Sequence, residues 1–213
     1  MRDSSSPSSF VDWLLHNNRR WADENPPAIK SKQNQPQCLW LECSECPVSP
    51  AAMTGAASGE LLVHRNLGNL ATDEDASLAA TLELALATFN IRDIVVCGHV
   101  GCVAMELAMN QEPQGSIDRW LIPVIEIANE YDDELSALTN QGSRSARLCE
   151  LNVEQQVVNL SRACNKRRGA AQAFDYSIHG CMFQPSSNRI MDLDVKVFGS
   201  VDTSEKRKYG ALH

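Results

Sequence analysis

The stretch Ile94-Val-Val-Cys-Gly-His-Val-Gly-Cys102 decides the fold, because a β-branched apolar run ends there at a glycine and two metal-binding residue types follow. A continuous apolar run of this kind is typical of a strand that is buried in a parallel sheet. The two glycines allow the chain to turn sharply where the strand ends. We therefore predict a buried strand over residues 93–97 that presents His99 and Cys102 together at its end.

A second set of thiols follows another short apolar strand, in Leu39-Trp-Leu-Glu-Cys-Ser-Glu-Cys-Pro47. In an open α/β sheet, functional residues gather at the ends of the strands. Thiolate sulfur and imidazole nitrogen are preferred ligands of Zn²⁺, and three protein ligands leave a fourth position for chemistry. We therefore predict a zinc site formed by Cys43, His99 and Cys102.

Two further residues compete for the fourth position. With Cys46 as a ligand, the Cys-x-x-Cys and His-x-x-Cys pairs have the spacing of a closed, structural zinc site. Glu45 offers two alternatives: its carboxylate coordinates the metal and closes the site, or it swings clear and serves as a general base for a zinc-bound water. The residues alone leave these three arrangements open.

Composition limits the class of protein. The 213 residues, 43% of them hydrophobic, suffice for one domain, which we predict over residues 9–201 between a disordered segment 1–8 and a charged tail 202–213. A net charge of −8 argues against a nucleic-acid partner. The chain has no apolar stretch of membrane-spanning length and no secretory signal at its N-terminus, so we read its eight cysteines as reduced. A soluble, cytoplasmic protein is expected.

Hydrophobic periodicity divides the chain into helices and strands. Apolar residues that recur every three to four positions predict helices over residues 9–25, 73–89, 117–130 and 147–164. Short apolar runs predict strands over residues 38–42, 60–64, 93–97, 174–179 and 190–197, the last of them at a sheet edge. The polar segment 132–145 is predicted to be a loop. Such an order is typical of the α/β class.

Several motifs of the chain, in order, resemble those of the β-class carbonic anhydrases. Besides the cysteine that ends the first strand, they are Asn17-Asn-Arg-Arg-Trp-Ala22, Gly59-Glu-Leu-Leu-Val-His-Arg-Asn66, Leu82-Glu83, Val96-Cys-Gly-His-Val-Gly-Cys102, Trp120-Leu121, Glu150-Leu-Asn-Val-Glu-Gln-Gln-Val-Val-Asn-Leu160 and Ile178-His-Gly180. The resemblance implies zinc on Cys43, His99 and Cys102, and a central, mainly parallel β-sheet flanked by helices. It also implies a projecting N-terminal helix and a homodimer that can pair into tetramers.

The resemblance implies a zinc lyase or hydrolase of the carbonate dehydratase type. In such an enzyme a zinc-bound hydroxide attacks a small electrophilic carbon, here that of carbon dioxide, to form bicarbonate. Two alternatives stay open: a homologue that acts on carbonyl sulfide or a larger metabolite, and a catalytically silent dimer that zinc stabilises.

The chain departs from the family pattern beside the first ligand. Where the family has Cys-Ser-Asp-Ser-Arg, this chain has Cys43-Ser-Glu-Cys-Pro47, so Glu45 replaces the aspartate and Pro47 replaces the arginine. In the family that arginine can hold the aspartate off the metal. Here Arg65 is the one arginine near a strand end that could take this role.

The predicted substrate pocket is also unusual, because aliphatic residues stand where the family often has aromatic ones. Its predicted members are Asn34, Leu62, Leu84 and Val100. On the predicted N-terminal helix, four large apolar residues exceed what a peripheral helix can bury on its own domain: Phe10, Trp13, Leu14 and Trp21. We predict that this helix packs on a partner subunit.

Overall fold

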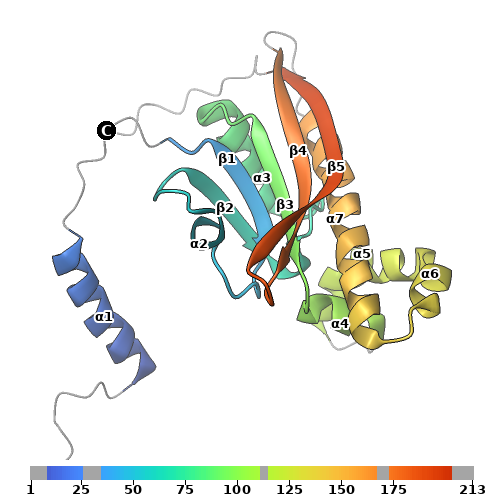
Figure 1. Ribbon diagram of the computed structural model, residues 1–213. Helices are drawn as coiled ribbons and strands as arrows, with labels where there is room; N and C mark the ends of the chain where they lie inside the picture. Colours follow the sequence, from blue (N-terminus) through green and yellow to red (C-terminus); the bar gives the residue numbers. More distant parts are fainter. Residues whose placement is uncertain (1–8, 26–34, 111–114, 167–172, 203–213) are drawn as a thin grey trace, which may run out of the picture. The chain divides into compact units, whose positions relative to one another are not determined.

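A computed structural model describes residues 9–25, 35–110, 115–166 and 173–202 (Figure 1). Contacts divide the chain into two compact units, residues 1–34 and 35–213, so the N-terminal helix is described by itself. The segment 1–8, predicted to be disordered, and the tail beyond Asp202 lie outside the described residues. The single domain over residues 9–201 stays a prediction.

Five strands form one sheet in the order β2-β1-β3-β4-β5 (Figure 1). The first four are parallel, and the fifth pairs with β4 in antiparallel orientation at the edge. The strands are β1 (Cys38–Cys43), β2 (Leu61–Asn66), β3 (Asp93–His99), β4 (Ala173–Gln184) and β5 (Arg189–Asp202). The predicted α/β fold, its mainly parallel sheet and its edge strand are confirmed. Because neighbouring parallel strands end at the same side of a sheet, β1 and β3 bring their last residues to one edge.

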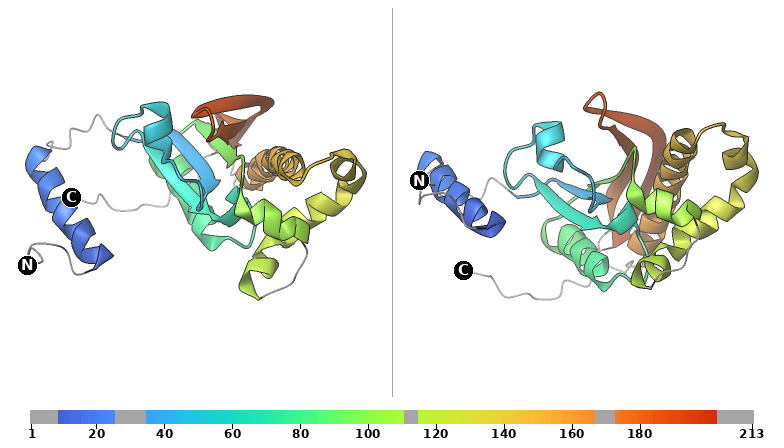
Figure 2. Two further views of the ribbon diagram at one scale, coloured as in Figure 1. Left: turned by 60° about the horizontal axis from the view of Figure 1, so that its bottom comes forward. Right: turned by 90° about the horizontal axis from the view of Figure 1, so that it is seen from below.

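The two faces of the sheet carry different cores, because successive strand side chains point to opposite faces. Leu39 and Leu41 of β1 belong to the main core, whereas Trp40 between them belongs to a smaller cluster on the other face. The helices α3 (Ala76–Glu83) and α7 (Gln141–Lys166) contribute to the main core. Figure 2 shows the short helix α2 (Pro50–Thr54) on the side of the sheet away from α3.

Glycine allows α7 to approach the end of β3 closely. A Cβ atom added to Gly98 would lie 2.8 Å from a methyl group of Val153 on α7 and 2.7 Å from the sulfur of Met182 on β4. Such distances are shorter than van der Waals contact, so any larger residue would push α7 away from the sheet. The glycine before His99 therefore keeps the strand end and the helix in contact.

The remaining helices are α4 (Val103–Asn110), α5 (Ser116–Glu130) and α6 (Asp132–Ala137), with a 3₁₀ turn η1 (Leu67–Asn69) and a π-helical turn η2 (Leu84–Thr88). The loop predicted over residues 132–145 is wrong, because α6 lies there and α7 begins at Gln141. Leu135 is the buried residue of α6, and three acidic residues in its first turn suit a helix N-terminus. The long helix predicted over residues 73–89 is a shorter α-helix followed by the π turn.

Helix α1 (Phe10–Glu24) begins where the sequence predicts, because the Ser9 hydroxyl accepts a hydrogen bond from the backbone N–H of Asp12 at 3.1 Å. No residue of α1 is buried. Its large apolar side chains are exposed on the helix. Among the described helices, none combines the length and the apolar character that a membrane span requires.

Candidate metal centre

Four side chains at the ends of β1 and β3 bring their ligand atoms within 4.8 Å of one another: Cys43, Glu45, His99 and Cys102. The two sulfur atoms lie 3.7 Å apart. Two sulfurs bound to tetrahedral zinc, each at about 2.3 Å, lie about 3.8 Å apart. The Nε2 atom of His99 is buried and has no hydrogen-bond partner among the described residues. The chain thus carries a Cys-His-Cys metal site whose donor atoms and spacing fit Zn²⁺.

The local backbone explains how the ligands converge. Cys43 is the last residue of β1 and His99 the last residue of β3. After His99 the chain turns through Gly101, whose φ of +79° is a conformation that glycine adopts without strain. The turn places Cys102 directly before α4, so that its sulfur returns to Cys43. Gly101 thus makes the predicted turn, whereas Gly98, also predicted to serve it, lies inside β3 and admits Val153 and Met182 instead.

The electrostatics of the site favour a thiolate at Cys43 before any metal binds. A hydrogen bond from the Cys102 thiol lowers the pKa of Cys43 to about 4, although burial acts in the opposite direction. The same contact, together with burial, raises the pKa of Cys102. Burial alone would lower the pKa of His99, but the Cys43 thiolate and the Glu45 carboxylate outweigh it and raise that pKa. Metal binding would displace the remaining protons.

Buried amides of α7 fix the turn that supports Cys43. The backbone N–H of Gly68 donates to the Cys43 sulfur at 3.3 Å, and the side-chain amide of Asn152 donates to the Gly68 carbonyl at 2.9 Å. Gln156 accepts a hydrogen bond from Ala71 N–H and donates one to Asn152, each at 2.9 Å. Such outer groups orient metal ligands. Asn152 and Gln156 were not predicted as site residues, although two polar residues four apart on an apolar helix face are a usable signal.

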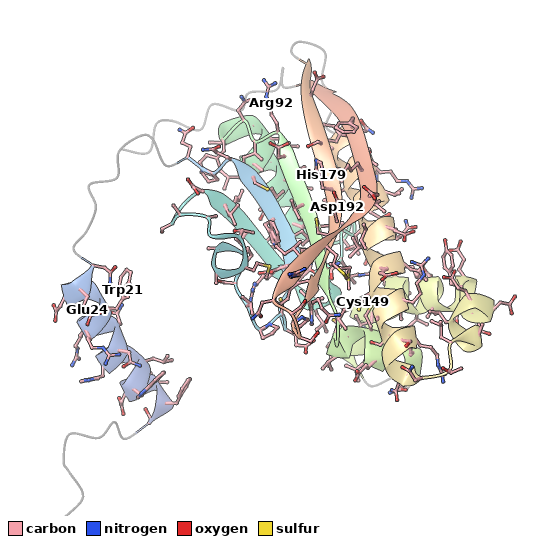
Figure 3. All side chains as sticks on the ribbon, in the orientation of Figure 1. Trp21, Glu24, Arg92, Cys149, His179 and Asp192 are labelled. Atoms are coloured by element: carbon pink, nitrogen blue, oxygen red, sulfur yellow. The ribbon has the colours of Figure 1, made fainter. Side chains whose placement is uncertain are left out.

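Cys149 of α7 lies next to the site without joining it. Its thiol donates to the carbonyl oxygen of His99 at 3.3 Å. Figure 3 shows Cys149 at the end of the sheet where β3 ends, whereas Arg92, just before β3, lies at the opposite end. Burial raises the pKa of Cys149 to about 12, so its thiol is protonated and lacks the thiolate that binds metals.

The carboxylate of Glu45 lies between His99 and the start of α4. Its Oε2 atom accepts a hydrogen bond from the backbone N–H of Val103 at 2.8 Å and lies 3.7 Å from Nε2 of His99. The side chain is 36% exposed, whereas that of His99 is 3% exposed. Glu45 is therefore the one member of the four-residue cluster that reaches solvent.

Cys46 does not join the cluster of ligand atoms. Its thiol points to the carbonyl of Val48 at 3.6 Å, and its side chain packs with Trp40, Cys97 and Phe183 on the other face of the sheet. Burial raises the pKa of the Cys46 thiol. The structure thus places Cys46 away from the position that the closed, four-ligand alternative requires.

Arg65 holds the carboxylate of Glu42 and not that of Glu45. Its Nε donates to the buried carboxylate of Glu42, the residue opposite it across β1 and β2. Its two terminal nitrogens donate to the carbonyl oxygens of Cys46 at 3.4 Å and Val48 at 3.1 Å. The expectation that Arg65 replaces the missing arginine beside Glu45 is therefore wrong.

The predicted pocket residues have different positions. Val100 directly follows His99 and is half-buried. Leu62 pairs with Leu39, four residues before the end of β1, which is about 13 Å along the strand. Leu84 is exposed at the start of η2, and Asn34 lies outside the described residues. Of the three pocket residues that the structure describes, Val100 alone lies next to the metal cluster, and the pocket role of Leu62, Leu84 and Asn34 stays a prediction.

Comparisons with known proteins agree with this fold and this site. A family model described as carbonic anhydrase matches residues 38–190. A carbonic anhydrase of Emericella nidulans is 26% identical over 205 residues, which cover 92% of this chain and 88% of the relative. One from Pseudomonas aeruginosa is 32% identical over 171 residues, which cover 75% of this chain and 74% of the relative.

Solved structures extend the likeness to three dimensions. A tetrameric β-carbonic anhydrase of Sordaria macrospora superposes with a TM-score of 0.77 at 28% identity, over 88% of this chain and 98% of that one. A Coccomyxa β-carbonic anhydrase in complex with acetazolamide superposes with a TM-score of 0.75 at 29% identity, over 92% of this chain and 89% of that one. Fold and site define an α/β metalloprotein with a Cys-His-Cys centre at its strand ends. The chain belongs to the β-class carbonic anhydrase family.

Proposed function

We propose that the protein is a zinc-dependent carbonic anhydrase that interconverts carbon dioxide and bicarbonate, with Cys43, His99 and Cys102 as its zinc ligands. Family membership supports the reaction class. The observation that carries the proposal is the convergence of these three ligand atoms with one partly exposed carboxylate beside them. Bound zinc would supply a Lewis acid that makes water a nucleophile at a pH of about 7.

The residues around the site have separate roles in this proposal. Cys43 and Cys102 hold the metal as thiolates, and Gly68 N–H stabilises the charge on Cys43. Glu45 orients the attacking water and takes up its proton, because its Oε2 atom is held by Val103 N–H beside His99 and its side chain is partly exposed to solvent. Val100 supplies an apolar surface that suits carbon dioxide. Leu62, Leu84 and Asn34 complete the proposed pocket.

Stopped-flow measurement of carbon dioxide hydration tests the proposal on zinc-loaded protein. The Glu45→Gln variant should retain its zinc and lose about a hundredfold in kcat, since a general base contributes about 10²–10⁴-fold. Glu130→Gln, at the exposed end of α5, is the matched control and should change nothing. A rate of carbon dioxide hydration in Glu45→Gln that equals that of the wild type would show that Glu45 is not the general base. A fully zinc-loaded wild type without hydration would refute the proposed substrate and favour carbonyl sulfide, a larger metabolite or a silent dimer.

We also propose a homodimer that can pair into a tetramer. The Sordaria macrospora relative is tetrameric, and the apolar side chains of α1 are exposed on the helix, which supports packing on a partner subunit. Light scattering should show a dimer or tetramer for the wild type, and Trp13→Glu with Trp21→Glu should weaken the assembly. Asp23→Asn on the same helix is the control. A wild type that is monomeric at every concentration would contradict the proposal.

A further inference from the structure

No arginine or lysine among the described residues pairs with the Glu45 carboxylate; its ion-pairing contact is with His99, which is itself a proposed zinc ligand. Pro47 stands where the family pattern has an arginine, and proline has neither a charge nor a backbone N–H. The nearest candidate, Arg65, is committed to Glu42 and to two backbone carbonyls. A carboxylate without a partner would turn toward the metal, because the metal would be the strongest positive charge nearby. Something else in this chain must decide where Glu45 lies.

The hydrogen bond that Glu45 accepts comes from the backbone of the first residue of α4. The Cys102 carbonyl accepts hydrogen bonds from the N–H groups of Met105 and Glu106, at 3.1 and 3.3 Å, so the helix begins at Val103. The first N–H groups of a helix have no partner within the helix. Val103 N–H donates instead to Glu45 Oε2 at 2.8 Å, a length typical of a charge-assisted hydrogen bond.

The glutamate is the right length for this contact. It has one methylene more than the aspartate of the family pattern, and the contact joins residues 58 positions apart in the chain. The helix end also favours a negative charge there. The Val103 side chain is 45% exposed, so packing of that side chain does not explain the arrangement. The longer side chain of Glu45 therefore reaches the backbone N–H of Val103.

We propose that the backbone N–H of Val103 is a positioning group that holds the Glu45 carboxylate beside the metal but off it, so that the fourth position stays open. The inference rests on the proposed function and deepens it. A single N–H donor adds no net charge to the site and makes one hydrogen bond where an arginine makes two. The Glu45 carboxylate is therefore held less tightly than one that is paired with a guanidinium.

A proline substitution removes this donor selectively. Proline lacks the N–H and is tolerated at the first position of a helix, so Val103→Pro should leave α4 intact. Val103→Ala is the matched control, because it shortens the same exposed side chain and retains the N–H. Both variants are loaded with Co²⁺ in place of zinc, and the visible absorption of the cobalt is followed while azide is added. Azide reports whether the fourth position is open, and metal content is measured for every variant.

Wild type and Val103→Ala should respond to azide at similar concentrations. Val103→Pro should require at least about tenfold more azide, because the released carboxylate occupies the fourth position most of the time and reduces the binding-competent fraction. Adding Glu45→Gln to Val103→Pro should restore the wild-type response. An unchanged azide affinity in Val103→Pro, with full metal content, overturns the proposal and leaves the contact as a helix cap only.

A second comparison covers the case in which Val103→Pro fails to fold. If Glu45 is held off the metal, Glu45→Gln and wild type should bind azide within about threefold of each other. Azide binding that is at least about tenfold tighter in Glu45→Gln would show that the carboxylate occupies the fourth position, and this overturns the proposal. Carbon dioxide hydration is assayed separately. If the azide affinities change as expected but hydration is absent, the proposed substrate is refuted and the role of Val103 is supported.

Discussion

The two sides of the metal site are built differently. On the side of Cys43, three hydrogen bonds follow one another. The backbone N–H of Gly68 donates to the Cys43 sulfur, Asn152 donates to the Gly68 carbonyl, and Gln156 donates to Asn152. On the side of Glu45, a single backbone hydrogen bond holds a side chain that is 36% exposed. The Cys43 side is buried and held by successive hydrogen bonds, whereas the carboxylate side is partly exposed and held by one.

This difference suits the two functions of the site, which are metal binding and proton transfer. A metal ligand must stay in place, and buried amide networks resist movement because each unpaired group would be costly. A general base must instead exchange protons with water and shift as the reaction proceeds, which a partly exposed carboxylate on one hydrogen bond can do. Substitutions on the ligand side should therefore affect metal content and stability, and those on the carboxylate side should affect activity.

The largest effect is expected from the ligands themselves. Cys43→Ser, His99→Ala and Cys102→Ser should each abolish stoichiometric zinc and lower the stability of the fold, because the ligands join the ends of two strands. Elemental analysis and thermal unfolding measure both effects. Cys164→Ser changes a buried cysteine on α7 outside the ligand cluster and should retain zinc. Full zinc in any ligand variant would exclude that residue from the site.

The next largest effect is expected at Arg65, which supports the loop that follows Glu45. Arg65→Met should lower the free energy of unfolding by about 3 kcal/mol, because the buried Glu42 loses its charged partner. Chemical denaturation measures the loss, and adding Glu42→Gln should recover most of it. Equal stability of wild type and Arg65→Met would show that the ion pair is dispensable.

The pH dependence of this variant provides a further check. Burial raises the pKa of Glu42 above its ordinary value, and Arg65 opposes that effect. In Arg65→Met the raised folded-state pKa means that the folded protein binds a proton more readily than the unfolded chain. The destabilisation should therefore be largest at neutral pH and shrink as the pH is lowered. A loss that grows on acidification would contradict this reading.

A smaller effect is expected from the outer amides. Asn152→Ala leaves the Gly68 carbonyl without its donor and should cost about 1–3 kcal/mol of stability. Zinc affinity should fall about tenfold, since outer groups of this kind orient the ligand. Competition with a chelator measures the zinc affinity. Val158→Ala is the control on the same helix, because Val158 is exposed and has no amide to join the network. An unchanged affinity in Asn152→Ala would separate this network from the metal.

The smallest effect is expected where the chain departs from its family. Pro47→Arg should change carbon dioxide hydration by less than about threefold, because Val103 already holds Glu45. In a Glu45→Asp background the shorter side chain loses its reach to Val103, so the introduced arginine should then matter more. A large gain from Pro47→Arg alone, measured by stopped flow, would show that Glu45 is not held off the metal in the wild type.

The sequence was sufficient to predict the strands and the ligand cluster. Buried parallel strands are continuous apolar runs, and the cluster lies where two such runs end at metal-binding residue types. The polar segment 132–145 was mispredicted because α6 buries little more than Leu135 and has no apolar stripe to reveal it. Periodicity therefore detects an element only where the element contributes to a core.

Contacts between distant segments could not be predicted in the same way. Glu42 faces Arg65 because β1 and β2 pair in that register, and no local pattern specifies the register of parallel strands. Every residue but proline has a backbone N–H, so nothing in the sequence marks that of Val103. Its role depends on where α4 begins relative to the turn after β1.

A crystal structure of the zinc-loaded wild type would show whether Val103 holds Glu45 off the metal. We expect zinc bound by the sulfurs of Cys43 and Cys102 at about 2.3 Å and by His99 at about 2.0–2.1 Å. We also expect Glu45 Oε2 within about 3 Å of the Val103 nitrogen, with an exchangeable ligand in the fourth position. A carboxylate oxygen of Glu45 at about 2.0–2.2 Å from the zinc, or a Cys46 sulfur at about 2.3 Å, would contradict this expectation.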